Sequence, residues 1–396
     1  MKSTFTGIAI GVALAGVAYG QSAPPVAVDN PDKVSWELFV IANRPAIPGS
    51  NIVAFETWAS NEDTFQPNPK FPGATAQPSC TPPQVAERSI APVRQSPVRA
   101  VASPKILHVP ALFDQEVSAQ PETGVRAVTS APVTSKEEVR RNQATFDFIV
   151  CNKLFTKAGL RAAFQAGLPM KFPLDSIEVK ANWISAGNRS PNSYLISTAS
   201  DGKRYALISM HVISKRVPNW TWATFEHQDN PGRCDIIGCH DSFGATAQDV
   251  PPNARPEGPY NPCVKSAAAK QLLADAGMPP VWNNYCLKGT QVDYVSATGA
   301  PTLVGNSVTE DGFVDSSSCM TCHVRAAIDA TARNLYGAGF VKASDGAVCP
   351  NGKRSCGPVG APNPAWFWNN PDQPNRSMLA LQTDFVWSLA RNAIGP

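Results

Sequence analysis

The stretch RYALISMHVISKRVPNWTWATFEH, residues 204–227, decides the fold class of this chain of 396 residues. Its two halves, 204–214 and 219–227, are rich in β-branched and aromatic residues and alternate well enough to be strands. Lys215 to Pro218 lie between them and can make a hairpin connection. The stretch therefore predicts two antiparallel strands at the centre of the molecule.

Two more segments extend this pair into a larger sheet. SIEVKANWIS at 176–185 and NNYCLKGTQVDYVS at 283–296 show the same enrichment in β-branched and aromatic residues, so we expect both to be strands. A helix, SAAAKQLLADAG at 266–277, interrupts the series. Gly277 is placed to end that helix, because glycine readily adopts the left-handed conformation that follows a last helical turn.

Helices are expected before the strands. One is predicted to start after Asn30 and to run through SWELFVIAN, with Trp36 and Phe39 on one face. The tetrad SKEE at 135–138 has the form of a capping box. It predicts a helical region through RRNQATFDFIVCNKLF that continues to Ala166.

The C-terminal part, residues 301–396, contains the motif CMTCH and two helix-like sequences at 324–337 and 377–393. Together these elements predict an α+β fold that is rich in loops, with a central antiparallel β region, peripheral helices and a helical C-terminal segment. We expect residues 21–300 and 301–396 to pack as one body, because no helix precedes the CMTCH motif to complete an independent domain.

Residues 1–20, MKSTFTGIAIGVALAGVAYG, have the form of a secretory signal peptide. Lys2 precedes an apolar run, and Ala18-Tyr19-Gly20 is a small-x-small cleavage site. We expect a periplasmic or secreted mature protein without a membrane span, because no later segment is apolar enough to cross a bilayer. The formal net charge is +3 and no basic stripe is present, which argues against nucleic acid as a partner.

Ten cysteines suit an exported protein, in which disulfides can form. Two belong to CMTCH, and the other eight allow four disulfides: Cys80, Cys151, Cys234, Cys239, Cys263, Cys286, Cys349 and Cys356. Proximity in sequence favours Cys349–Cys356 and Cys263–Cys286 as pairs. Many of the 37 prolines fall within 66–134, which we expect to be a long surface excursion.

Cys319, Cys322 and His323 form the pattern C-x-x-C-H, which is typical of covalent haem c attachment. On a helical turn these positions share one face, so two thiols can bond one porphyrin while the imidazole lies under the iron as proximal ligand. Two alternatives stay open at this point. The thiols could form a redox-active or structural pair, or they could be half of a zinc site completed by Cys349 and Cys356.

A second haem is a further hypothesis. Cys234, Cys239 and His240 form C-x4-C-H, a rarer spacing for haem attachment. The alternative is a small disulfide loop after a strand, with His240 on the surface.

The sixth ligand of the iron could come from three residues. His227 follows Trp220, Trp222 and Phe225, an aromatic setting that could form the wall of a haem pocket, and His211 lies on the preceding strand. Met378 lies at the very start of the last helix-like sequence, and small one-haem cytochromes carry a methionine ligand just before their terminal helix. Each of the three could equally be an ordinary packed or hydrogen-bonded residue.

The chain resembles a group of long, exported, mostly uncharacterised bacterial proteins of the cytochrome c family. The resemblance rests on patches spread over most of the chain: SWELFVIAN, FETWAS, YALISMHVISK, NWTWATFEHQDN, CLKGTQVDY, SSSCMTCH and LQTDFVWSL. It implies haem on Cys319 and Cys322, with His323 on the iron. A histidine that this resemblance leads us to expect near Ser214 is absent, which weakens any proposal of a multi-histidine site on that strand.

The haem motif favours single-electron transfer, with a periplasmic redox protein as the partner. The alternative is a haem enzyme, a peroxidase or oxygenase acting on a small molecule, with an open iron site near His227. Glu226 and His227 would then be acid–base candidates and Arg233 would stabilise negative charge. If the segment is a strand, Glu226 and His227 point to opposite faces, so at most one of them can face the iron. A third possibility, a non-catalytic haem sensor, has no specific support.

Overall fold

The computed structural model describes residues 29–47, 49–78, 80, 136–167, 169–199, 202–252, 260–337 and 339–396. The predicted signal peptide and most of the predicted excursion, residues 81–134, lie outside the described residues. In the described part of the chain, no helix is long and apolar enough to cross a bilayer.

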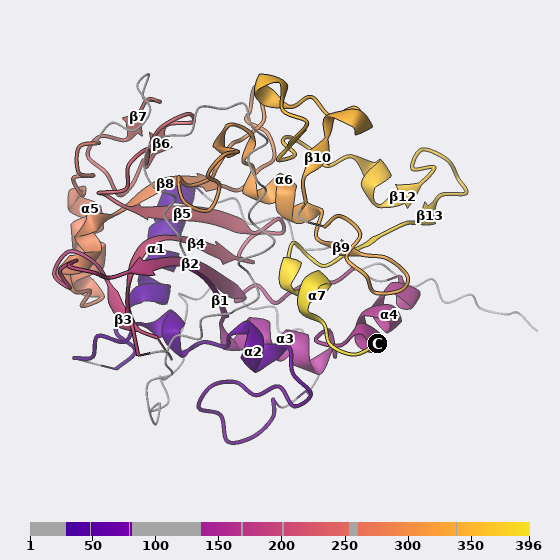
Figure 1. Cartoon of the computed structure of the whole chain (residues 1–396), viewed down its shortest axis with the longest axis horizontal. Helices are drawn as coiled ribbons and strands as arrows, with labels where there is room; N and C mark the ends of the chain where they lie inside the picture. The colour runs from indigo at the N-terminus through magenta and orange to yellow at the C-terminus, as the bar shows by residue number, and fades with distance from the viewer. Residues whose placement is uncertain are drawn as a thin grey trace, which may run out of the picture.

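A six-stranded antiparallel sheet forms the centre of the molecule (Figure 1). Its strand order is β1-β2-β4-β5-β8, and β3 pairs with β4 beside this path. The strands are β1 (Lys136–Arg141), β2 (Ile177–Ser185), β3 (Ile196–Thr198), β4 (Arg204–Ser214), β5 (Thr221–His227) and β8 (Tyr285–Gln291). The four predicted strands are confirmed, and β4 and β5 pair as the predicted hairpin.

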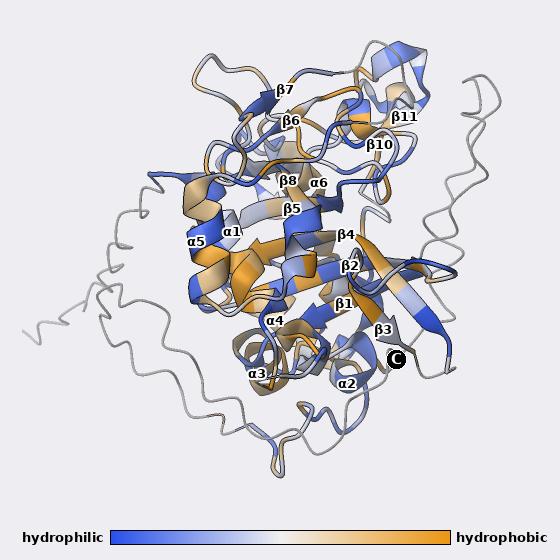
Figure 2. Ribbon diagram, turned by 90° about the vertical axis from the view of Figure 1, so that its left-hand side faces the viewer, coloured by the Kyte–Doolittle hydropathy of each residue, from blue (hydrophilic) through white to orange (hydrophobic). Residues whose placement is uncertain are grey.

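Helix α1 (Pro31–Asn43) covers one face of the sheet, as the sequence predicts. The Asn30 side chain accepts the backbone N–H of Lys33 and caps it. Trp36 and Phe39 pack against Phe225, with ring centroids 5.2 and 4.4 Å apart respectively. Helix α5 (Ala267–Asp275), capped by Ser266, adds Leu273 to this apolar cluster, which we name the α1-side core. Apolar residues concentrate on the sheet and on the helices beside it (Figure 2).

The C-terminal segment covers the other face. Helices α3 (Gln143–Cys151), α4 (Lys157–Ala166), α6 (Cys319–Val324) and α7 (Trp387–Asn392) share a second cluster with β4 and β5, which we name the α6-side core. Its buried members include Ile213 and Trp222 from the hairpin and Met320 and Leu389 from the C-terminal segment. Residues from both sides of position 300 therefore build one core, and the C-terminal elements lie beside the sheet (Figure 1).

Short elements complete the described chain. They are α2 (Asn61–Thr64), six short 3-10 helices and four two-stranded ribbons: β6 (Cys239–His240) with β7 (Asp249–Val250), β9 (Ala327–Ile328) with β14 (Leu381–Gln382), β10 (Val341–Lys342) with β11 (Ser355–Cys356), and β12 (Trp368–Asn369) with β13 (Ser377–Met378). The 3-10 helices are Ala54–Thr57, Pro280–Asn284, Val314–Ser316, Ala343–Asp345, Pro350–Gly352 and Pro364–Trp366.

The capping box predicted at 135–138 is wrong. Residues 136–141 form edge strand β1, and the helix begins only at Gln143, capped by Asn142. The reason is tertiary: buried Arg141 donates to the Ser60 carbonyl at 2.8 Å and to the Thr64 hydroxyl at 2.7 Å. These contacts require the extended backbone and override the local helix signal.

The C-terminal segment is less helical than predicted. The helix expected at 324–337 does not form: α6 ends at Val324, and residues 327–328 pair with residues 381–382 in a two-stranded ribbon. That same pairing removes the first half of the helix expected at 377–393, leaving only α7.

Four disulfides staple the fold: Cys80–Cys151, Cys234–Cys239, Cys263–Cys286 and Cys349–Cys356. Both pairs favoured by the sequence are confirmed. Four disulfides are typical of an exported protein.

Candidate functional site

The CMTCH motif forms most of α6, directly against the sheet. Cys319, Cys322 and His323 lie on one side of this helical turn and are partly exposed, whereas Met320 and Val324 point into the α6-side core. All ten cysteines are described, and Cys319 and Cys322 are the two that form no disulfide. The helix therefore places two unpaired thiols and one imidazole on one of its sides.

The imidazole of His323 is oriented by the backbone. Its Nδ1 lies 2.9 Å from the carbonyl oxygen of Phe385, which can only accept a hydrogen bond, so Nδ1 carries the proton. Nε2 is left with a free lone pair. Burial lowers the pKa of His323 to about 3, which keeps the ring neutral. Trp222 of β5 packs on the ring with centroids 4.5 Å apart. A neutral imidazole with this tautomer can bind a metal only through Nε2.

A strained turn supplies the Phe385 carbonyl. Asp384 and Phe385 have φ of 48° and 71°, the left-handed region that non-glycine residues rarely adopt. Asp384 is held on both carboxylate oxygens: Lys215 Nζ lies 2.5 Å from Oδ1, and the Phe172 N–H donates to Oδ2 at 2.8 Å. Lys215, in the β4–β5 hairpin, thereby holds the turn whose Phe385 carbonyl accepts the hydrogen bond from His323.

The two thiols are confined by backbone. Cys319 Sγ lies 3.3 Å from the carbonyl oxygen of Val304. Beside Cys322 stands Gly339, where an added Cβ would lie 2.9 Å from Cys322 Sγ and 2.8 Å from the Trp387 ring. Burial raises the pKa of both thiols, that of Cys322 to about 11 and that of Cys319 well above its usual value. Both are therefore protonated near neutral pH, unlike the thiolates of redox-active pairs.

These residues are compatible with a covalently bound haem. Two unpaired thiols with an imidazole whose Nε2 is free provide the donor set that attachment and proximal ligation need. The zinc hypothesis loses two of its four ligands, because Cys349 and Cys356 are bonded to each other. Among the described residues, no group of three or more His, Cys, Asp or Glu side chains is placed to hold a metal ion.

Of the two strand histidines, His211 is the one on the same face of the sheet as this site. Its Nε2 is 3.1 Å from Asn306 Nδ2 and 3.3 Å from Glu310 Oε1. Besides burial, the nearby charge of Lys180 lowers the pKa of His323, and the charge of Glu310 raises the pKa of Cys319. Glu310, which contacts His211, and Lys180 therefore lie near enough to the motif for their charges to shift the pKa values of its residues.

His227 lies on the opposite face. Along β5, Trp222, Thr224 and Glu226 contact the C-terminal segment, whereas Phe225 and His227 face the α1-side core. His227 Nε2 donates to the Ser193 carbonyl at 2.9 Å, and its Nδ1 accepts the Asp229 N–H at 3.2 Å. Both ring nitrogens are thus occupied in a fully buried residue, which removes His227 as a ligand candidate.

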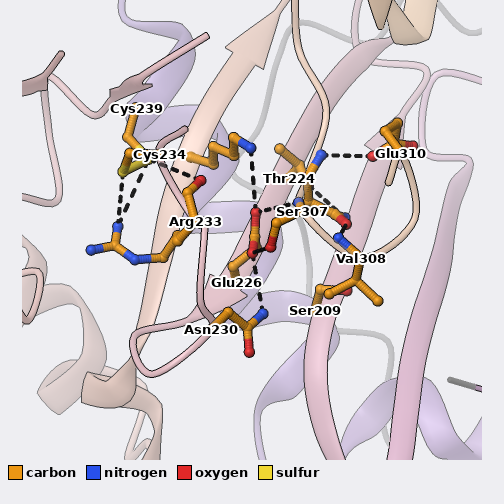
Figure 3. A network of polar contacts seen from close by, with 12 residues as sticks. Ser209, Thr224, Glu226, Asn230, Arg233, Cys234, Cys239, Ser307, Val308 and Glu310 are labelled. Atoms are coloured by element: carbon orange, nitrogen blue, oxygen red, sulfur yellow. Dashed lines mark hydrogen bonds and ion pairs between the residues drawn. A yellow bond between two sulfur atoms is a disulfide. The ribbon is translucent and has the colours of Figure 1, made fainter. Parts of the chain in front are cut away.

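Glu226 does face the C-terminal side, but its carboxylate is saturated (Figure 3). Ser307 donates to it from both its N–H and its hydroxyl, at 2.9 and 2.5 Å. Asn230 donates at 3.1 Å, and the Lys288 ammonium lies 3.5 Å away. Glu226 is completely buried, so it anchors the loop that follows Val304 rather than serving as an acid–base group.

Two further hypotheses from the sequence concern Arg233 and the C-x4-C-H motif. Arg233 points toward Cys234 and Cys239 (Figure 3), and it donates to the Asn261 carbonyl at 3.1 Å. Cys234 and Cys239 are bonded to each other, which leaves no thiol for a second haem. His240 bonds Asp249 at 2.6 Å and is more than half exposed. The disulfide-loop alternative is therefore correct.

Met378 lies on β13, opposite Trp368 in register, and packs at the edge of the α6-side core. An open pocket of about 410 Å³ borders that core, and Val324, Trp368 and Phe385 are among the residues that line it. Phe385 thus contributes its backbone carbonyl to His323 and also lines the pocket.

Sequence reasoning missed the residues that orient the motif. The Phe385 carbonyl could not be predicted, because a backbone acceptor has no sequence signature. The Lys215–Asp384 pair could not be predicted either, because its residues are 169 positions apart. Gln291, completely buried at the end of β8, was also missed. The available signal in the sequence was a polar amide, Gln291, within the strand predicted at 283–296.

No known protein family, curated protein or solved structure matches this chain. The resemblance to cytochrome c family proteins therefore rests on the quoted residues alone, and the function of the site is argued from its geometry.

Proposed function

We propose that this chain is an exported c-type haem protein that transfers single electrons in the periplasm. One observation carries the proposal: the two unpaired cysteines share a helix face with a histidine whose Nδ1–H is held by the Phe385 carbonyl. Cys319 and Cys322 would form the two thioether bonds, and Nε2 of His323 would be the proximal ligand. When bound, the haem would supply a one-electron couple at this site.

The surroundings of the motif support electron transfer. Trp222 packs on His323, and the fixed imidazole needs little rearrangement when the charge at the site changes. The four disulfides hold the surrounding loops together and support an oxidising compartment. The ligand opposite His323 would come from His211 or Met378.

The test is covalent attachment. The full chain would be produced in cells that mature c-type cytochromes, denatured, and assayed for haem that stays with the polypeptide. We expect retention in the wild type and loss in Cys319→Ala/Cys322→Ala. Cys349→Ala/Cys356→Ala is the matched control, since it also removes two cysteines from the C-terminal segment but should retain haem. Absence of covalent haem from the wild type would refute the proposal.

A second candidate function is a haem enzyme, and a specific observation favours keeping it. The His211–Glu310 pair offers an acid–base group on the side of the motif, in place of His227 and Glu226. The spectrum of the reduced protein with and without carbon monoxide separates the two functions. Absorption bands that stay in place when carbon monoxide is added indicate that both axial positions are occupied, which favours electron transfer. Absorption bands that shift indicate an open iron site.

A further inference from the structure

A buried ion pair links the central hairpin to the acceptor of His323. Lys215 follows β4, its side chain is 8 % exposed, and its Nζ lies 2.5 Å from Asp384 Oδ1 and 2.6 Å from the Pro218 carbonyl oxygen. The ammonium also lies over the Trp220 ring, 5.8 Å from the centroid. Because a charge buried this far is costly unless paired, Lys215 requires Asp384 at this place.

Asp384 in turn belongs to the strained pair of residues that presents the Phe385 carbonyl. Two consecutive non-glycine residues with φ of 48° and 71° persist only when their surroundings hold them. The Asp384 carboxylate is fixed by Lys215 and by the Phe172 N–H. Thr383 and Val386 flank the two strained residues. The Thr383 N–H donates to the Ala326 carbonyl at 2.8 Å, and the Thr383 hydroxyl donates to the Val386 carbonyl at 2.9 Å.

We propose that the Lys215–Asp384 ion pair is a positioning device that holds the Phe385 carbonyl on His323 Nδ1–H and thereby sets the reduction potential of the haem. This inference rests on the proposed function. A carbonyl that accepts the Nδ1–H raises the basicity of Nε2, and a more basic ligand favours ferric over ferrous iron. The hydrogen bonds of the Lys215 and Asp384 side chains go to each other, to Pro218 and to Phe172, so the pair acts on His323 through the turn.

The positioning role makes a prediction that a direct effect of charge does not. If the pair acted only through its electric field, Lys215→Met would lower the potential and Asp384→Asn would raise it, because the two variants remove charges of opposite sign. If the pair positions the carbonyl, both variants loosen the turn and both raise the potential. Lys215→Arg, which keeps the charge, should stay close to the wild type.

Arg216 provides a matched control. It adjoins Lys215 and forms a more exposed ion pair with Glu37 at 3.1 Å. Arg216→Met removes the same charge from the same hairpin without touching the turn. Its potential should not rise.

A second readout does not need haem. In the Cys319→Ala/Cys322→Ala protein, ¹⁵N NMR of His323 should show the Nδ1–H tautomer, and adding Lys215→Met or Asp384→Asn should populate the other tautomer. If the wild type binds no haem, the proposed function fails while this measurement still tests the positioning. Opposite shifts of potential in the two variants, or an unchanged tautomer in both, would overturn the inference.

Discussion

Gln291 accepts the backbone N–H of Met320 through its side-chain Oε1 at 3.0 Å. The first turn of α6 therefore has a cap that comes from β8, since the side chain of Ser318 does not cap the helix. Gln291 Nε2 donates to the Ser318 hydroxyl at 2.9 Å, so the one side chain fixes both the entry and the first turn of the motif.

Gln291→Leu should therefore disturb the motif more than its volume suggests. The change leaves the buried Met320 N–H without a partner, which costs about 1–3 kcal/mol. We expect a lower midpoint of chemical denaturation and a smaller yield of covalently attached haem. Gln291→Glu keeps the acceptor and should preserve more of the attachment than the leucine variant. Equal yields in the leucine variant and the wild type would contradict the capping role.

Gly339→Ala tests how closely the backbone approaches Cys322. The residue has φ of +88°, and its new Cβ would meet Cys322 Sγ and the Trp387 ring at under 3 Å. We expect a loss of roughly 1–3 kcal/mol from the strained backbone together with impaired haem attachment at Cys322. Gly346→Ala is the matched control, with φ of +86° and nothing within 4 Å of its added Cβ. It should share the backbone cost but keep full attachment, as measured by mass spectrometry of the intact chain.

The opposite faces of the sheet make a prediction about the two strand histidines. His211→Ala should change the visible spectrum of the haem protein, because His211 borders the site beside Glu310. His227→Ala should leave the spectrum unchanged and lower stability, because the ring stacks on Tyr194 with centroids 3.7 Å apart and bonds Ser193. A spectral change in the His227 variant with none in the His211 variant would reverse this assignment. An unchanged spectrum in both would direct attention to Met378.

Four of the six strands of the sheet could be predicted from the sequence, because strands such as 204–214 carry their pattern locally. The pairing of Cys263 with Cys286 and of Cys349 with Cys356 could also be predicted, because those partners are close in the chain. The helix expected from residue 135 could not be corrected from the sequence, since Arg141 is held by residues about 80 positions earlier.

The same limit applies to the candidate site. The spacing in CMTCH identifies Cys319, Cys322 and His323, because one helical turn contains all three. The orientation of His323 depends on the carbonyl of Phe385, which lies 62 residues away and has no distinguishing side chain. The choice between His211 and His227 required knowing which face of β5 meets the C-terminal segment, and alternation alone does not specify a face.

Lys265 should make the stability of the protein rise with pH in the alkaline range. Burial lowers its pKa to about 7, against the opposing charge of Asp241, and its Nζ lies 3.2 Å from the Cys263 carbonyl oxygen. Between pH 7 and the ordinary lysine value, the unfolded chain binds one more proton than the folded chain. The free energy of unfolding therefore gains up to about 1.4 kcal/mol per pH unit in this window.

Lys265→Met isolates that effect, because the thiols and tyrosines that also titrate at high pH are the same in both proteins. We expect the methionine variant to be more stable than the wild type at pH 6, where the folded wild type carries a buried charge. The difference should shrink as the pH rises above 7, as followed by urea denaturation at a series of pH values. Lys270→Met, on the exposed side of α5, is the control and should show a constant difference across this range. A wild type and a Lys265 variant that differ by the same amount at every pH would show that Lys265 is charged in the folded protein throughout.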